Sequence, residues 1–296
     1  MSNAIIGPIR PNFLILAPAC VLLGIATAFW SGASLNALYI VLILTGALMA
    51  HASVNALNEY HDFKSGLDFI TEATPFSGGT KTLPNHPTQA HWALITGIVS
   101  IVLVACIGVY FVRERGPWLL PVGILGLIII YTYTPLITRS PFLCLIAPGL
   151  GFGPLMVMGT DFILTGRYSW TAAVASLVPF FLVNDLLLLN QFPDVEPDRQ
   201  VGRDHLLIRV GRPAGARVYV LFMILNYAVI LFACLFGVLP QGALLGLLTL
   251  ILAVPVMRGV IRHAEDIPGL IPYMAKNVMI NIGTPVLVAL GLFINR

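Results

Sequence analysis

Charged residues are scarce in this chain: they occupy 10% of its 296 positions, while 58% are hydrophobic. Soluble globular domains carry about 25% charged residues, so an ordinary water-soluble fold is excluded. Long hydrophilic stretches are also missing, because the longest gap between apolar runs extends from about 58 to 89. Residues 1–296 are therefore predicted to form a single polytopic membrane domain.

Cysteine is similarly rare. The four cysteines all fall inside apolar runs, and none of them forms a CxxC pair. This pattern indicates neither a disulfide framework nor a zinc site. We interpret the cysteines as small packing residues within helices.

What the sequence does contain is a series of apolar runs of about 20 residues, long enough to cross a bilayer as helices. They predict an all-α, multi-pass membrane protein of about nine transmembrane helices. The expected spans are about 11–31, 35–57, 90–112, 117–134, 143–163, 169–189, 213–237, 240–258 and 277–295. The first resembles a signal peptide, but similar runs follow it to the end of the sequence, so we interpret it as a retained helix.

Lysine and arginine are distributed unevenly between the two sets of loops that these spans define. One set holds Arg10, Lys64, Lys81, Arg139, Arg199, Arg203, Arg209, Arg212, Arg217, Arg258, Arg262 and Lys276, against Arg113, Arg115, Arg167 and Arg296 in the other. The positive-inside rule then predicts a cytoplasmic N-terminus in the cell (inner) membrane. The loops after the second and sixth spans, which carry two acidic clusters, would share that cytoplasmic face and could meet there.

The first cluster follows the second span. Four polar residues share one helical face, at offsets 0, 4, 7 and 11: His51, Asn55, Asn58 and Asp62. Such a face avoids lipid and is expected to line the bundle interior or a wet cavity. Gly66 allows the chain to turn, so that Asp68 can return towards Asp62.

The second cluster follows the sixth span. Asn190, Asp194 and Asp198 repeat every four residues, again as one helical face, although Pro193 makes the register uncertain. Together the two clusters offer only oxygen ligands, which suit Mg²⁺ that bridges carboxylates to phosphates. The predicted metal ligands are Asn58, Asp62, Asp68, Asn190, Asp194 and Asp198. Nearby basic residues could hold the rest of a diphosphate: Lys64, Lys81, Arg139, Arg199 and Arg203.

The stretches NEYHDFKSGLD (58–68) and NQFPDVEPDRQVG (190–202) resemble the two aspartate-rich motifs of the UbiA superfamily of intramembrane prenyltransferases, and most closely its menaquinone-type, dihydroxynaphthoate-prenylating branch. Three further stretches are similar to that branch: IRPNFLILAPACVLLGIATA (9–28), YTYTP (131–135) and IPYMAKNVMINIG (271–283). Two features depart from the pattern. Glu59 stands where the family usually has Asp, and residues 74–84 differ from the corresponding loop.

The resemblance implies a UbiA-like bundle around a central cavity, and a reaction without a protein nucleophile. A polyprenyl diphosphate would ionise with help from Mg²⁺, and an aromatic quinone precursor would attack the resulting cation. Asp62, Asp194 and Asn58 are the expected catalytic residues, and Tyr131 is a further candidate for the diphosphate. The expected partners are the two substrates and the lipid bilayer, without nucleic acid.

Several alternatives remain open at this point. The acceptor could be dihydroxynaphthoate, 4-hydroxybenzoate, homogentisate or none, as in a terpene cyclase. A different class of function, an ion-coupled transporter, is also an alternative. Asn55, His51 and Asp185 are candidates for an acceptor pocket, although Asp185 could equally make a structural hydrogen bond. Arg10, at the membrane edge, is interpreted as an orientation anchor.

Overall fold

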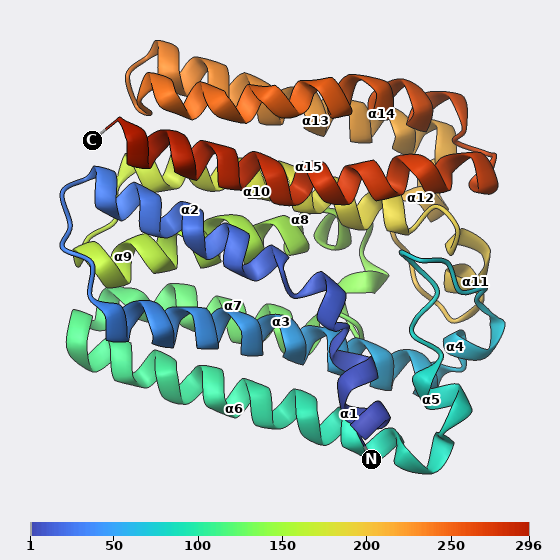
Figure 1. Ribbon diagram of the computed structural model, residues 1–296. Coiled ribbons are helices and arrows are strands. Elements are labelled where there is room, and N and C mark those ends of the chain that lie inside the picture. The colour runs from blue at the N-terminus through green and yellow to red at the C-terminus, as the bar shows by residue number, and fades with distance from the viewer. Residues whose placement is uncertain (1, 296) are drawn as a thin grey trace.

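Residues 2–295 are described by a computed structural model, in which long helices lie side by side in one bundle (Figure 1). No strand occurs within this range, so the predicted all-α class is confirmed. The helices are α1 Ser2–Ile9, α2 Leu16–Trp30, α3 Ala37–Ser65, α4 Leu67–Ile70, α5 Thr82–Asn85, α6 Ala90–Arg115, α7 Leu120–Thr132, α8 Pro141–Leu150, a π-helical segment Gly151–Met158, α9 Gly159–Thr165, α10 Trp170–Asn190, α11 Val195–Gln200, α12 Leu206–Val210, α13 Arg212–Leu235, a 3₁₀ segment Gln241–Thr249, α14 Leu250–Arg262 and α15 Ile267–Ile294.

Seven helical stretches within residues 2–295 are long and apolar enough to cross a membrane, and a bent pair that ends with α2 would make an eighth. The stretch Pro117–Thr132, which contains α7, is apolar but shorter. Each predicted span thus has a helical counterpart, but the expected number of nine is not confirmed. α15 begins well before the predicted boundary at 277, because Asp266 caps its N-terminus by accepting a hydrogen bond from the Gly269 amide.

The first predicted span, 11–31, is broken. Two helical pieces, Ile6–Phe13 and Leu16–Trp30, meet at an angle of 52°. Arg10 adopts a left-handed backbone conformation with φ of 50° directly before Pro11. Proline disfavours the α-helical conformation for the residue before it, which explains why α1 ends before the 3₁₀ turn Pro11–Phe13; the 52° bend itself lies further along, between Phe13 and Leu16.

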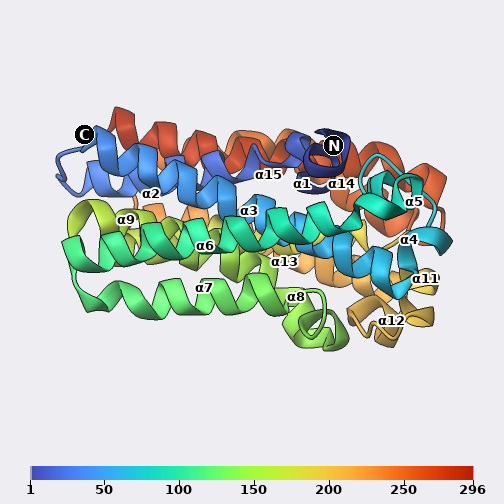
Figure 2. The same ribbon diagram turned by 90° about the horizontal axis from the view of Figure 1, so that it is seen from below.

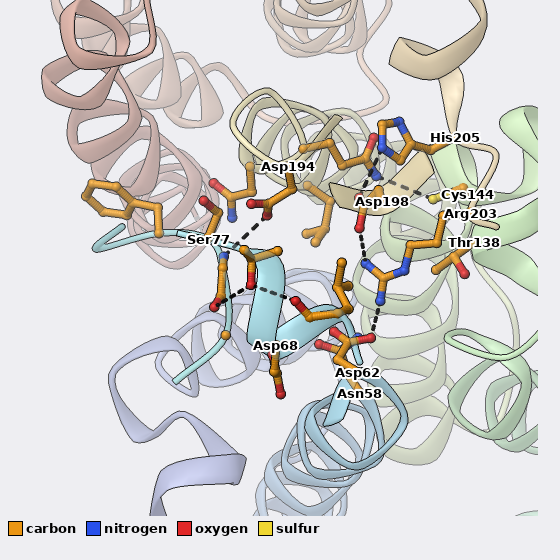
Figure 3. A pocket seen from close by; sticks show the side chains of 18 of the residues that line it. Asn58, Asp62, Asp68, Ser77, Thr138, Cys144, Asp194, Asp198, Arg203 and His205 are labelled. Atoms are coloured by element: carbon orange, nitrogen blue, oxygen red, sulfur yellow. Dashed lines mark hydrogen bonds and ion pairs between the residues drawn. The ribbon is translucent and has the colours of Figure 1, made fainter. Parts of the chain in front are cut away.

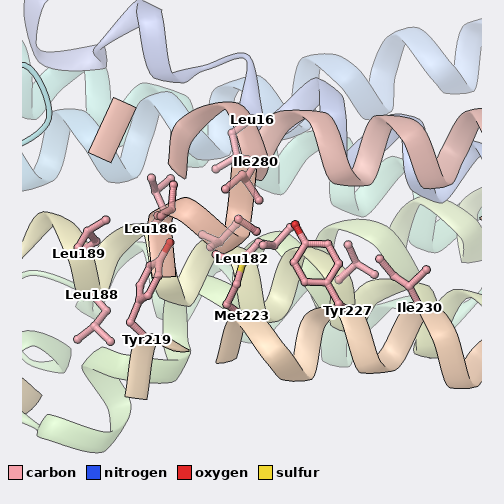
Figure 4. Packing of buried hydrophobic residues seen from close by; sticks show 14 of the residues in the cluster. Leu16, Leu182, Leu186, Leu188, Leu189, Tyr219, Met223, Tyr227, Ile230 and Ile280 are labelled. Carbon is pink, nitrogen blue, oxygen red and sulfur yellow. The ribbon is translucent and has the colours of Figure 1, made fainter. Parts of the chain in front are cut away.

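α10 is the central helix, with 67% of its apolar window buried, a larger share than in any other candidate span of residues 2–295. α2, α13 and α15 pack around it through side chains such as Leu182, Met223 and Ile280 (Figure 4). Large apolar side chains also cover the outside of the bundle; Trp170 and Ile251, for example, are 85% and 78% exposed. An apolar exterior of this kind suits a lipid environment.

The short helices α4, α5, α11 and α12 gather at one end of the bundle (Figures 1 and 2). α4 directly follows the C-terminus of α3, and α11 follows that of α10. The two acidic motifs therefore lie at the same end of the molecule, which positions the candidate site described next.

Candidate active site

A pocket of about 110 Å³ lies between the two acidic motifs at this end of the bundle (Figure 3). All six side chains predicted as oxygen ligands line it: Asn58, Asp62, Asp68, Asn190, Asp194 and Asp198. Contact between α4 and α11, the short helices that follow α3 and α10, thus accompanies the meeting of two motifs that are far apart in the sequence.

The first motif reaches the pocket through a helix and a turn. α3 continues past the predicted end of its span and carries Asn58 and Asp62 on its last turns, and Gly66, with φ of 84°, then ends it in the left-handed conformation. The turn places Asp68 on the same pocket, where the side chain is buried and Oδ2 has no hydrogen-bond partner within residues 2–295. Burial, reinforced by the charges of Glu59 and Asp62, raises the pKa of Asp68 to about 7.

The second motif is not a single helix. α10 and α11 are separated by a turn at 191–194, which holds Pro193, so the expected continuous helical face is interrupted. Asp194 and Asp198 nevertheless both line the pocket. The Asp194 carboxylate accepts a hydrogen bond of 3.3 Å from the Gly78 amide. Burial, together with the nearby charge of Asp198, raises the pKa of Asp194 to about 7.

Arg203 lies between the two motifs (Figure 3). Its Nη2 pairs with Asp62, and its Nη1 donates to Asp198 at 2.9 Å. The other carboxylate oxygen of Asp198 lies 3.1 Å from Nε2 of the buried His205. The sequence grouped Arg203 with the basic residues near the site, but only the structure shows that it bridges one acid from each motif.

Of the six side chains predicted for the diphosphate, Arg203 lines this pocket and five do not: Lys64, Lys81, Arg139, Arg199 and Tyr131. The Lys81 ammonium instead donates to the carbonyl oxygens of Asp68 and Thr71, at 2.7 and 2.6 Å, and so fixes the loop above the site. Arg199 pairs with Glu196 on the surface, and Tyr131 is 59% exposed.

The pocket is lined instead by two residues that were not predicted to bind the diphosphate, Arg10 and Tyr133. Arg10 donates to Glu59 at 2.6 Å and to Asn58 at 3.2 Å, so its interpretation as an orientation anchor is corrected. The fully buried Glu59 also accepts hydrogen bonds of 2.9 Å from the amide and the hydroxyl of Thr80. Glu59 therefore ties the N-terminal segment and the 74–84 loop to α3, and does not itself line the pocket.

A second, apolar cavity of about 620 Å³ extends from the site into the bundle, between α3, α6, α7 and the π-helical segment. Four residues line both cavities, so the two adjoin: Arg10, Asn58, Tyr133 and Leu187. His51 and Asn55, which the sequence offered as candidates for an acceptor pocket, line the apolar cavity. The His51 ring packs edge-on against Phe152 at 4.8 Å, and its Nδ1 has no hydrogen-bond partner among the described residues.

Asp185 lines neither cavity. It lies on α10 two residues from Leu187, which lines both, and a separation of two residues turns a helical side chain to roughly the opposite face. Asp185 is fully buried, and neither carboxylate oxygen has a hydrogen-bond partner within residues 2–295. The structure therefore separates Asp185 from the expected acceptor pocket.

The pocket suits a hard divalent cation in its chemistry. It gathers carboxylate and carboxamide oxygens, the ligands that Mg²⁺ prefers, and one of them, Asp68 Oδ2, is buried without a partner. A side chain at Gly79 would place its Cβ 2.5 Å from the other Asp68 oxygen, so the glycine keeps this approach clear. Among residues 2–295, no three acidic, histidine or cysteine side chains converge closely enough to hold one ion. Arg203 stands between Asp62 and Asp198, which explains their separation.

Comparison with known proteins identifies the family. The model of the UbiA prenyltransferase family matches residues 16–268. The 1,4-dihydroxy-2-naphthoate octaprenyltransferase of Bacillus subtilis is 30% identical over 68% of this chain and 64% of its own length. The enzyme of the same name from Escherichia coli is 27% identical over 97% of this chain and 94% of its own length.

Solved structures show the same fold. A UbiA homolog from Aeropyrum pernix K1 superimposes with a TM-score of 0.71 at 15% identity, over 96% of this chain and 98% of that one. A UbiA homolog from Archaeoglobus fulgidus, bound to GPP and Mg²⁺, gives a TM-score of 0.60 at 14% identity, over 97% and 99% of the two chains. These likenesses support the predicted UbiA-like bundle.

Proposed function

Because the chain belongs to the UbiA prenyltransferase family, we propose that it transfers a polyprenyl group from a polyprenyl diphosphate to an aromatic quinone precursor of the dihydroxynaphthoate type. The observation that carries this proposal is that an oxygen-lined pocket adjoins a deep apolar cavity, with Arg10, Asn58, Tyr133 and Leu187 lining both. The oxygen-lined pocket suits a metal-bound diphosphate, and the apolar cavity suits a hydrocarbon chain. The names of the relatives from Bacillus subtilis and Escherichia coli support the choice of acceptor class.

The diphosphate end of the site is built from both motifs. Mg²⁺ would be held by the six oxygen-bearing side chains Asn58, Asp62, Asp68, Asn190, Asp194 and Asp198. When bound, it would supply positive charge that stabilises the departing diphosphate. Arg10 and Arg203 line the same pocket and offer fixed guanidinium groups to the leaving oxygens.

The apolar cavity serves the other half of the reaction. As the bond between the first prenyl carbon and the diphosphate oxygen breaks, the allylic cation needs surroundings that exclude water. The cavity wall is mostly apolar and adjoins the pocket. A carbon of the electron-rich ring then bonds to the prenyl carbon, and the ring releases a proton.

His51 and Asn55 are the polar groups positioned to orient the acceptor. The free Nδ1 of His51 can hydrogen-bond an acceptor hydroxyl without breaking an existing bond among the described residues. Asn55 already donates to the Ile9 carbonyl at 3.0 Å, so its amide oxygen is the group that remains to receive a hydroxyl. The site, with its basic loops, would face the cytoplasm of the cell membrane.

The test is a transfer assay with the purified protein in detergent or vesicles. Labelled polyprenyl diphosphate is incubated with dihydroxynaphthoate, 4-hydroxybenzoate or homogentisate, with and without Mg²⁺, and the products are identified by mass spectrometry. We expect Mg²⁺-dependent prenylation of dihydroxynaphthoate. A prenylated product of another acceptor would overturn the acceptor class, and diphosphate release without an acceptor would point to cyclisation.

Variants connect the activity to the pocket. Asp62→Ala and Asp194→Ala are expected to abolish turnover while the protein remains in the membrane. Asp204→Ala is the matched control, because Asp204 pairs outward with Arg209 and does not line the pocket. Full activity in either pocket variant would refute the assignment. Gradient-driven uptake without product would instead support the ion-coupled transporter, which the family membership disfavours.

A further inference from the structure

His205 lies in a short non-helical segment between α11 and α12. Arg203 and His205 both line the pocket, while Asp204 between them pairs outward with Arg209. This alternation is typical of an extended chain, in which successive side chains point to opposite sides. The segment is anchored at Asp204, whose amide donates to the Thr138 carbonyl at 2.9 Å. The backbone therefore directs His205 towards the second acidic motif.

The Asp198 carboxylate is held on both of its oxygens (Figure 3). Arg203 Nη1 donates to Oδ1 at 2.9 Å, and His205 Nε2 lies 3.1 Å from Oδ2. An ionised carboxylate only accepts hydrogen bonds, so Nε2 is the donor. The Arg203 amide also donates to the Asp198 carbonyl at 3.0 Å. These bonds fix the orientation of the carboxylate in the pocket.

Packing and helix capping do not account for the His205 imidazole. The side chain is only 2% exposed, and its Nδ1 has no hydrogen-bond partner within residues 2–295. Burying a polar atom without a partner costs free energy, which an apolar side chain at this position would avoid. His205 precedes α12 at the N-cap position, but its side chain makes no capping hydrogen bond. The bond to Asp198 is thus the contact that explains a histidine here.

Asp198 is one of the proposed Mg²⁺ ligands. A carboxylate offers about four lone-pair sites, so the two hydrogen bonds leave it able to bind an ion. Groups that hydrogen-bond a ligating carboxylate orient it towards the metal, and their loss typically lowers metal affinity about 10–100-fold. The position of His205 behind Asp198 matches this role.

We propose that His205 is a positioning residue, whose Nε2–H holds Oδ2 of Asp198 so that the carboxylate presents its remaining lone pairs to Mg²⁺. The proposal rests on the proposed function, in which Asp198 helps to hold the metal-bound diphosphate. His205 acts through Asp198 and does not itself contact either substrate.

The test compares two amide substitutions that differ in reach. Glutamine carries its amide nitrogen as far along the side chain as histidine carries Nε2, so His205→Gln can keep the hydrogen bond. Asparagine is one bond shorter, so His205→Asn cannot. His205→Ser, which also falls short of Asp198, is measured in parallel in case His205→Asn does not fold.

His263→Leu is the matched control. His263 also pairs with an aspartate, Asp266, at 2.9 Å, but neither residue lines the pocket. Mg²⁺ is titrated in the presence of inorganic diphosphate, and the thermal stabilisation of each purified variant is measured relative to its own melting temperature in chelator. The Mg²⁺ requirement is thereby separated from the intrinsic stability of the variant.

We expect His205→Asn to need at least about tenfold more Mg²⁺ for half-maximal stabilisation, and His205→Gln and the control to stay close to the wild type. A residue that only supports the fold would lower the melting temperature in chelator and leave the Mg²⁺ requirement unchanged. That result, or an equal rise in His205→Gln or in the control, overturns the positioning role. So does a wild type that Mg²⁺ and diphosphate fail to stabilise.

Transfer assays separate this proposal from the proposed function. At saturating Mg²⁺, His205→Asn should regain most of the wild-type kcat, because His205 does not contact the substrates; a kcat that stays low contradicts the proposal. If the Mg²⁺ requirement shifts as expected but the wild type prenylates no acceptor, the proposed function is wrong and the positioning role stands.

Discussion

Arg203 offers the sharpest test of how the acidic site is held together. It pairs with one carboxylate from each motif, and the exposed fractions of the Arg203, Asp62 and Asp198 side chains are only 16%, 9% and 3%. Arg203→Met keeps much of the aliphatic volume but leaves these two acids buried without their shared cation. Breaking a buried ion pair from one side costs about 3–5 kcal/mol, so we expect a loss of this size in metal-free protein.

The loss should depend on divalent cations. In the variant, Mg²⁺ can supply the missing positive charge between Asp62 and Asp198, so added Mg²⁺ should stabilise Arg203→Met more than it stabilises the wild type. The measurement is thermal or denaturant unfolding of the detergent-solubilised protein, in chelator and then at increasing Mg²⁺. Activity is followed separately.

Arg199→Met is the matched control, four residues away. Arg199 pairs with Glu196 at 3.0 Å, but the side chains are 53% and 59% exposed, so its loss should cost at most about 1 kcal/mol. Equal unfolding of Arg203→Met and wild type in chelator would refute the bridging role. Equal stabilisation of Arg203→Met and the wild type by Mg²⁺ would refute the idea that the Arg203 guanidinium occupies the position of a bound cation.

Three other predictions concern the surroundings of the site. Lys81→Met removes the hydrogen bonds to the Asp68 and Thr71 carbonyls. Since each hydrogen bond is worth about 1–3 kcal/mol, the KM for the diphosphate should rise roughly tenfold or more in steady-state kinetics. An unchanged KM would contradict the role of Lys81 in holding this loop. Burial raises the pKa of Asp68 and Asp194 to about 7, so the folded state binds more protons than the unfolded state between about pH 4 and 7. Metal-free protein should therefore lose stability as pH rises through that window, as measured by melting in chelator at each pH, and a gain would contradict the assigned shifts. Gly149→Ala should destabilise the protein by about 1–3 kcal/mol, because its Cβ would overlap α10 atoms; Gly151→Ala, whose Cβ meets no described atom within 4 Å, should be neutral or stabilising, and equal unfolding of the two variants would exclude this packing argument.

The sequence was sufficient for features that depend on local periodicity. Apolar runs of membrane length predicted the helices, and the helical spacing of His51, Asn55, Asn58 and Asp62 predicted residues that line the two adjoining cavities. Gly66 predicted the turn that returns Asp68 to the site. These features follow from the constant angle between successive residues of a helix and from the backbone freedom of glycine.

Only the tertiary structure decided which distant groups meet. Arg203 between the two acids, Arg10 on Glu59, Tyr133 in place of Tyr131, and Asp185 on the far face of α10 all depend on how the helices pack and how the turn at 191–194 breaks the helical phase. A sequence period fixes the face of a helix on which a residue lies, but not the neighbour that this face meets. Interhelical contacts, and the cavity that they leave open, arise from packing between segments that the sequence does not place side by side.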